Sequence, residues 1–275
     1  MKRQLTTFPT VAEFARAKDL ADRLGLPCEV IEPAASLARV ATPALVLPTD
    51  ARAKLEESAA AGVVFSGWVD YRPATAGMPE GPAPAYAEDV FVRAAIVVLA
   101  PCVADETRIR LIAHLAGDLA PVLPYLNAAW THASFLPAAE TLTLLDGHRR
   151  IALYPRRITI ARADEIVDAW VTLERIRRQV NEIWARRAEI EPSHVTRRKP
   201  PPIEIFKRLP RTNCGRCGEP SCMAFAARLW SGEVGLARCT PAHEPTNRTL
   251  LDALVEICAG LGLPAEDGDA EGMGR

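Results

Sequence analysis

Four of the seven cysteines lie between residues 214 and 239, in the pattern Cys214-x2-Cys217-x4-Cys222-x16-Cys239. Four soft sulfur donors suit an iron–sulfur cluster or a tetrahedral zinc ion, and they exclude magnesium and calcium. Zinc ribbons use two short Cys-x2-Cys arms, whereas here three close cysteines are completed by one distant cysteine. The spacing therefore favours a cubane iron–sulfur cluster held by all four cysteines, with zinc as the alternative.

The residues between these cysteines favour a backbone that folds closely around a bulky group. Gly215 and Gly218 have no side chains, so the chain can turn its N–H groups toward the sulfides of a cluster. The pair Pro220-Ser221 is typical of a helix start and predicts a helix over residues 223–230. Cys222 would then lie in the first turn, where the positive end of the helix dipole stabilises a thiolate.

Basic residues are concentrated in the segment that precedes the cysteines. The stretch from residue 149 to 211 contains 16 Lys and Arg against 8 Asp and Glu, a charge of +8, although the whole chain has a net charge of −1. Cations near an anionic cluster favour its reduced state electrostatically; the nearby ones are Lys207, Arg208, Arg211 and Arg216. The stretch is first interpreted as a solvated helix face followed by a linker, and the alternative is a surface that docks an acidic redox partner.

The stretch from Ile203 to Ala226 resembles the [4Fe–4S] domain of the corrinoid/iron–sulfur protein large subunit. It is also similar to the domain in the B subunit of Rnf-type electron-transport complexes. Residues 121–202 resemble the segment that precedes this domain in stand-alone iron–sulfur proteins of anaerobes. The resemblance implies that one low-potential cluster is ligated at four positions, Cys214, Cys217, Cys222 and Cys239.

The first 72 residues show alternating strand and helix patterns. Short strands are predicted at 5–8, 28–31, 44–47 and 63–69, and helices at 10–24 and 49–61, the first with Thr10 as N-cap and Glu13 completing a capping box. This order predicts a small ferredoxin-like sandwich. The region also resembles sulfur- or selenium-carrier domains through Phe8-Pro9, but it has Leu37-Ala38-Arg39-Val40 where those domains place a Cys-Gly pair.

The remaining chain predicts an α+β protein of several parts. A buried strand is predicted over 90–99, a helix over 105–115, a hairpin over 141–154, a strand over 157–161 and a long helix over 164–187. A final helix is predicted over 246–260. We expect a ferredoxin-like domain at 1–72, a linker at 73–89, an α+β middle domain at 90–190, a linker at 191–202, a cluster domain at 203–262 and a tail at 263–275.

Composition limits the functional class. The longest apolar run, residues 94–100, is far too short to span a bilayer, and the N-terminus does not read as a secretory signal, so we expect a cytoplasmic protein. The near-neutral charge and the absence of a groove-reading motif argue against nucleic acid. The sequence leaves the oligomeric state open.

No pattern in the chain points to a catalytic nucleophile, a phosphate loop or a nucleotide fingerprint, so we expect a protein that is not an enzyme. Cys28, Cys102 and Cys258 stand alone and are interpreted as core residues, and His243 as a loop residue. The leading hypothesis is low-potential, single-electron transfer to or from a partner redox protein. The alternatives are a maturation or carrier protein for clusters or sulfur, and a cluster-based redox sensor.

Overall fold

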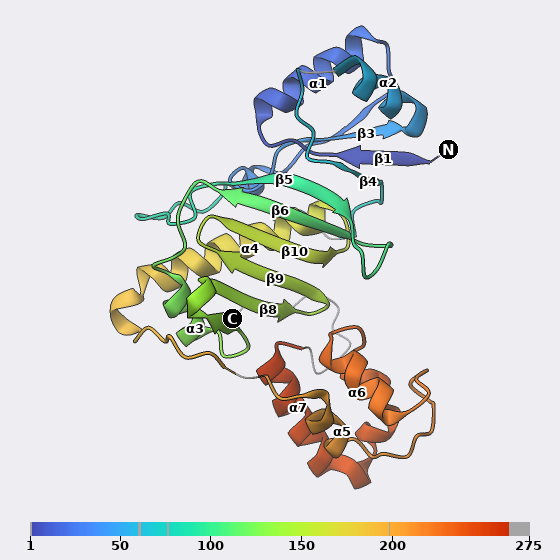
Figure 1. The fold of residues 1–275 in the computed structure, drawn as a ribbon, viewed down its shortest axis with the longest axis vertical. Helices are drawn as coiled ribbons and strands as arrows, with labels where there is room; N and C mark the ends of the chain where they lie inside the picture. The colour runs from blue at the N-terminus through green and yellow to red at the C-terminus, as the bar shows by residue number, and fades with distance from the viewer. Residues whose placement is uncertain (1, 60–61, 76, 198, 264–275) are drawn as a thin grey trace. The chain divides into compact units, whose positions relative to one another are not determined.

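The computed structural model describes residues 2–59, 62–75, 77–197 and 199–263 (Figure 1). Helices and antiparallel strand pairs are combined in it, which confirms the predicted α+β class. The chain divides into two units, residues 1–126 with 152–191 and residues 127–151 with 192–275. The predicted tail lies outside the described residues, apart from Leu263.

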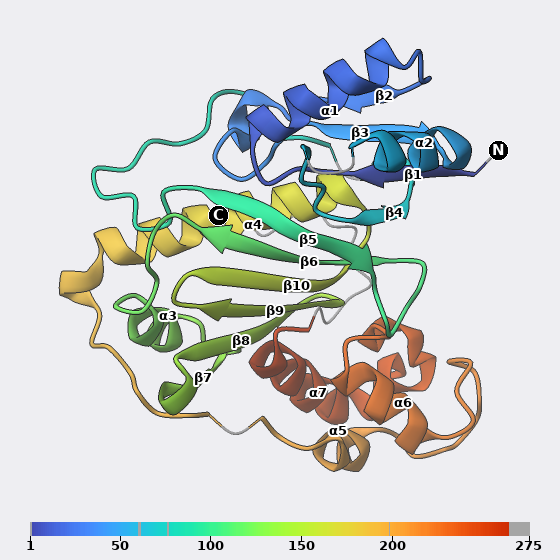
Figure 2. The same cartoon turned by 45° about the horizontal axis from the view of Figure 1, so that its top comes forward.

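The first unit begins with a four-stranded sheet and two helices. Its elements are β1 (Arg3–Thr6), α1 (Val11–Arg23), β2 (Glu29–Ile31), β3 (Ala44–Pro48), α2 (Thr49–Ala59) and β4 (Trp68–Asp70). This strand and helix order was predicted and is confirmed. The strands pair antiparallel in the order β2-β3-β1-β4, and both helices lie on one face of the sheet (Figure 2). The core between them is aliphatic and aromatic: Phe8, Ala17, Ala21, Leu45, Leu47, Ala51 and Leu55.

The start of α1 follows the predicted cap in part. Thr10 is the N-cap, and its hydroxyl accepts the N–H of Glu13 at 3.1 Å. The carboxylate of Glu13 accepts the N–H of Val64 at 2.9 Å and pairs with Arg16, where the capping box predicted a bond back to the cap residue. Glu13 therefore ties the helix to the segment before β4.

A second sheet has six strands in the order β5-β6-β10-β9-β8-β7. Its elements and neighbouring helices are β5 (Ala94–Pro101), β6 (Ile109–Leu115), α3 (Leu123–Ala129), β7 (Ser134–Leu136), β8 (Thr141–Asp146), β9 (Arg149–Tyr154), β10 (Arg157–Ala163) and α4 (Ile166–Ala185). The strands predicted over 141–145, 150–154 and 157–161 and the long helix are present. Helix α4 lies across one face of β5, β6 and β10 (Figure 2).

The helix predicted over residues 105–115 was wrong, because residues 109–115 form strand β6. Alternate residues of this strand are buried, at Ile109, Leu111, Ala113 and Leu115. Arg110 and His114 are exposed between them. These two polar positions are four residues apart, a spacing that also fits one face of a helix. The alternation of buried and exposed residues along the strand decides between the two.

The proline-rich segment before β5 is fastened to α4. Arg177 is 1% exposed, and its guanidinium donates to the carbonyl of Pro84 at 2.9 Å and to Asp89 at 2.6 Å. It also pairs with Glu174 at 3.0 Å. Asn181 adds a bond from its amide to Asp89 at 2.9 Å. Part of the basic stretch therefore serves internal ion pairs.

The second unit contains the cysteine module, which we define as residues 203–263. It consists of α6 (Cys222–Trp230), α7 (Arg248–Leu261), most of α5 (Pro202–Arg208) and 3-10 turns at Leu236–Arg238, Thr240–His243 and Pro245–Asn247. After α7, Gly262 adopts a left-handed φ of 73°, and a Cβ there would lie 2.7 Å from the carbonyl oxygen of Leu145. No helix in the described ranges is both long and apolar enough to cross a membrane.

Candidate metal centre

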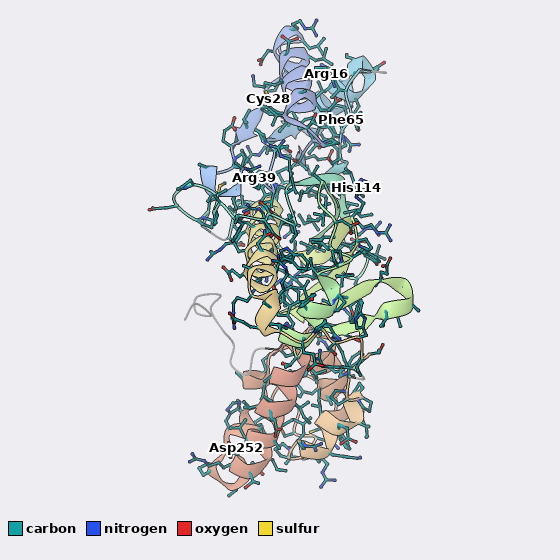
Figure 3. The ribbon with its side chains drawn as sticks, turned by 90° about the vertical axis from the view of Figure 1, so that its left-hand side faces the viewer. Arg16, Cys28, Arg39, Phe65, His114 and Asp252 are labelled. Carbon is teal, nitrogen blue, oxygen red and sulfur yellow. The ribbon has the colours of Figure 1, made fainter. Side chains whose placement is uncertain are left out.

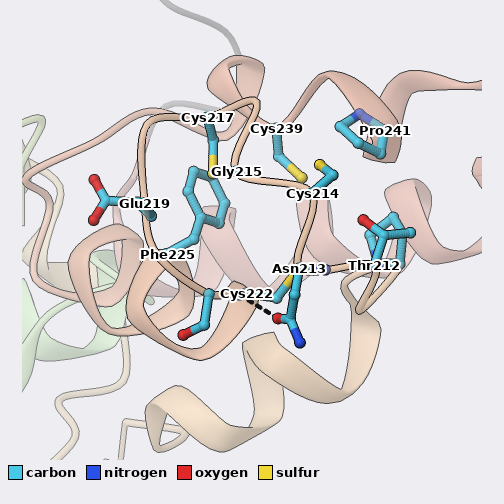
Figure 4. A pocket seen from close by; sticks show the side chains of 12 residues that line it. Thr212, Asn213, Cys214, Gly215, Cys217, Glu219, Cys222, Phe225, Cys239 and Pro241 are labelled. Carbon is cyan, nitrogen blue, oxygen red and sulfur yellow. Dashed lines mark hydrogen bonds between the residues drawn. The ribbon is translucent and has the colours of Figure 1, made fainter.

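The structure brings all four predicted cysteines to the wall of one pocket (Figure 4). Cys214 and Cys217 lie in the loop between α5 and α6, Cys222 is the first residue of α6, and Cys239 lies between two 3-10 turns. Among the described residues, no three His, Cys, Asp or Glu side chains are arranged to hold a single metal ion. The four thiols therefore line one cavity, but they are not arranged around a single metal position.

Helix α6 begins where the sequence predicted. The hydroxyl of Ser221 accepts the N–H of Ala224 at 3.1 Å and caps the helix, and the helix ends before Gly232, whose φ is 71°. Cys222 is therefore in the first turn, as predicted, with its sulfur near the positive end of the helix dipole. The helix buries Phe225, Ala226 and Leu229 in the core of the module.

A left-handed backbone runs through the loop that carries Cys214 and Cys217. Gly215 and Gly218 have φ angles of 70° and 84°, and a Cβ on Gly218 would lie 3.2 Å from the guanidinium of Arg238. Arg211 and Asn213 are also left-handed, with φ angles of 57° and 48°, although neither is glycine. Such angles are costly for residues with a Cβ. The loop is therefore shaped by its surroundings rather than by local preference.

The four thiols differ in exposure and acidity. Cys214 is exposed and Cys217 is half-buried, while Cys222 and Cys239 are buried. A hydrogen bond from the hydroxyl of Thr212 lowers the pKa of Cys214, and Arg216 adds to this effect. Burial raises the pKa of Cys239. One edge of the cysteine set thus faces solvent, and the other lies in the core of the module.

The cations predicted to surround the cysteines are partly neutralised. Lys207 and Arg208 both pair with Glu204, at 2.7 Å and 3.0 Å. Arg216 pairs with Glu244 at 3.3 Å and also donates to the sulfur of Cys214. Of these three cations, Arg216 contacts a predicted ligand directly.

Two residues of the site were not predicted as functional. Asn213 forms hydrogen bonds with Cys222, and Glu219 lines the pocket wall while its carboxylate points away from the cysteines (Figure 4). Glu219 is 7% exposed and pairs with Arg228, which also pairs with Glu233 at 3.3 Å. Asn213 directly precedes Cys214, which was its only signal in the sequence.

The other cysteines lie elsewhere in the fold. Cys28 packs against the core of the first sheet (Figure 3), and Cys102 is buried after β5. Cys258 is fully buried in α7, and its burial raises its pKa to about 11. These positions agree with their interpretation as core residues. His243 ends a 3-10 turn, as expected of a loop residue.

The residues present fit an iron–sulfur group. The pocket offers four cysteine thiols, and four cysteine thiolates are the usual ligands of iron–sulfur clusters. Gly215 on the pocket wall has open space where a side chain would stand, so the backbone can lie against a bulky inorganic group there. Cys214, Cys217, Cys222 and Cys239 would hold the group, whose chemistry is the uptake and release of electrons.

A family model and several known proteins are similar to part of the cysteine module. Residues 209–241 match a family model described as "Putative Fe-S cluster", and all four cysteines fall within the match. The corrinoid/iron–sulfur protein large subunit of Moorella thermoacetica is 42% identical over 73 residues, 24% of this chain and 16% of that protein.

Two archaeal subunits are also similar. Acetyl-CoA decarbonylase/synthase complex subunit gamma 1 of Methanosarcina thermophila is 52% identical over 40 residues, 14% of this chain and 8% of that protein. The gamma subunit of Methanocaldococcus jannaschii is 39% identical over 56 residues, 19% of this chain and 12% of that protein. The chain thus spans at most 16% of the length of these relatives, and no solved structure matches it. The comparisons confirm the resemblance to the corrinoid/iron–sulfur large subunits and support an iron–sulfur cofactor in the part of the chain that contains residues 209–241.

Proposed function

We propose that the protein binds one [4Fe–4S] cluster through Cys214, Cys217, Cys222 and Cys239 and exchanges single electrons with a partner redox protein. The observation that carries this proposal is the convergence of all four cysteines on one pocket within the segment that matches an iron–sulfur family. The cubane type is supported by the spacing of three close cysteines and one distant cysteine.

The unequal exposure of the thiols supports electron transfer. A cluster held by the buried Cys222 and Cys239 is fixed in the module, while the exposed Cys214 brings one edge to the surface. A docked partner could approach this edge without entering the protein. We therefore place the route of the electron at Cys214, beside Arg216, whose charge favours a partner with an acidic surface.

The N-terminal parts are proposed to select that partner in the cytoplasm and to have no catalytic role. The first sheet supports a ferredoxin-like domain over residues 1–72, because its βαββαβ order and strand order β2-β3-β1-β4 are those of a split βαβ sandwich. We retain the middle domain at 90–190 and the cluster domain at 203–262 as proposals. The linker proposed at 73–89 would be held against α4 by Arg177.

The exposure of Cys214 also favours a second candidate, a carrier that donates its cluster, because an acceptor thiol could reach the same edge. The two functions are separated by mixing the reduced, cluster-loaded protein anaerobically with an oxidised one-electron carrier and with an apo-ferredoxin. Electron transfer predicts oxidation of the cluster with all iron still bound to this chain. Movement of iron and sulfide to the apo-protein without net oxidation would contradict it and favour the carrier.

A third function, a redox sensor, is tested in the same material. A sensor must change its affinity for a partner when the cluster changes state. We expect the partner redox protein to bind the oxidised and reduced forms with affinities that differ by less than about threefold, below the range typical of allosteric coupling. A much larger difference, together with slow electron exchange, would overturn the electron-transfer proposal.

A further inference from the structure

The residue before the first cysteine, Asn213, is joined to the third cysteine by two hydrogen bonds. Its backbone N–H donates to the sulfur of Cys222 at 3.4 Å, and its side-chain oxygen accepts the N–H of Cys222 at 2.9 Å (Figure 4). We propose that Asn213 is a positioning residue that fixes the sulfur of Cys222 and raises the reduction potential of the cluster. This inference rests on the proposed function.

The backbone of Asn213 has the conformation that this arrangement requires. Five residues other than glycine have a positive φ in the described chain, and two of them, Arg211 and Asn213, lie in the three residues before Cys214. Asn tolerates the left-handed region better than most residues with a Cβ. Strained angles of this kind gather at functional sites, where neighbouring contacts hold them in place. Here the contacts with Cys222 hold Asn213.

The side chain of Asn213 shares the capping of α6 with Ser221. The first N–H groups of a helix have no partner within the helix. Ser221 accepts the N–H of Ala224, and Asn213 accepts the N–H of Cys222. Because both accepted N–H groups belong to the first turn, the two bonds fix the orientation of the helix end that carries the Cys222 sulfur.

The backbone N–H of Asn213 acts on the sulfur itself. Cys222 is buried, so water competes little for its sulfur, whereas Cys214 is exposed. A hydrogen bond to a ligand sulfur stabilises negative charge, and a cluster gains negative charge on reduction. The N–H of Asn213 therefore favours the reduced state. This effect needs only the left-handed backbone, whereas the capping effect needs the side-chain oxygen.

Two substitutions separate these effects. Asn213→Gly removes the side-chain oxygen but keeps easy access to the left-handed region, so the N–H stays on the sulfur. Asn213→Ala removes the same oxygen and also disfavours that region. We expect the midpoint potential to stay at the wild-type value in Asn213→Gly and to become more negative in Asn213→Ala. Both variants should release iron to a chelator roughly two- to fivefold faster, because the N–H of Cys222 loses its acceptor.

The control is Glu140→Ala, which alters another left-handed residue of the same unit, with a φ of 44°, directly before β8. It should leave both the potential and the rate of iron release unchanged. If the cluster is present and both Asn213 variants have the wild-type potential, the inference is wrong and the proposed function stands. If the wild-type chain contains no iron, the proposed function is wrong, and the inference falls with it.

Discussion

The N-terminal sheet and the cysteine module build their cores from different materials. The sheet packs Phe8, Leu45, Leu47 and Leu55 between its strands and two helices. The core of the module includes three buried cysteines, Cys222, Cys239 and Cys258, and two of these are proposed ligands. The core of the sheet therefore gains its stability from the burial of apolar side chains, with no cysteine ligand in it. The module is expected to depend on what its thiols bind, as small metal-binding domains do.

The largest effect is expected from Cys239→Ser. A hydroxyl is a poor ligand for iron compared with a thiolate, so the variant should lose essentially all of its iron. Amide hydrogen exchange should then rise in α6 and α7 and stay slow in β1 and β3. The matched control is Cys258→Ser, a buried cysteine of the same core, which should keep its iron. Full iron in Cys239→Ser would remove this residue from the ligand set.

A substitution in the core of the N-terminal sheet should lower the stability of that region and leave the iron content unchanged. Leu55→Ala empties a fully buried position between α2 and the sheet and should destabilise the N-terminal region by about 2–5 kcal/mol. Urea denaturation measures the loss, and iron per chain should not change. Val64→Ala, at a position 56% exposed, is the control and should cost less than about 0.5 kcal/mol. Iron loss in Leu55→Ala would show that the two regions are not independent.

An intermediate effect is expected at the pair of Arg228 and Glu219. Arg228→Met leaves the buried carboxylate of Glu219 without its partner, at a cost of about 1–3 kcal/mol. The double variant with Glu219→Gln should recover most of this loss, because the uncompensated charge is gone. Equal stability of the single and double variants, measured by thermal unfolding, would mean that the charge of Glu219 does not matter.

The smallest effects are expected at two helix caps whose hydrogen bonds have the same length. Thr10 and Ser221 each accept an N–H at 3.1 Å, one in the sheet region and one beside Cys222. Replacement of either by Ala should cost about 1 kcal/mol of stability. Only Ser221→Ala should also speed the release of iron to a chelator. Faster release of iron from Thr10→Ala would contradict the expectation that the two regions are stabilised independently.

Local patterns predicted much of this structure. Thr10 and Ser221 were recognised as helix starts, and the order of the first six elements followed from hydrophobic spacing. Strand β6 was missed because Arg110 and His114 fit a helix face as well as a strand. The four cysteines were found from spacing alone, because soft ligands at short intervals are rare by chance.

The remaining features of the site depend on contacts that spacing does not reveal. The bond between Asn213 and Cys222 accompanies a left-handed backbone at Arg211 and Asn213, which few sequence signals predict. The burial of Glu219 depends on Arg228, which lies at the other end of α6. The proline-rich segment is held by Arg177, whose partners Pro84 and Asp89 lie about 90 residues before it in the chain.

The central claim is most directly tested by metal and sulfide analysis of anaerobically purified protein, together with electron paramagnetic resonance after reduction. A [4Fe–4S] centre predicts four irons and four sulfides per chain, no zinc, and a signal that appears on one-electron reduction. One zinc per chain with no sulfide and no such signal would contradict the account.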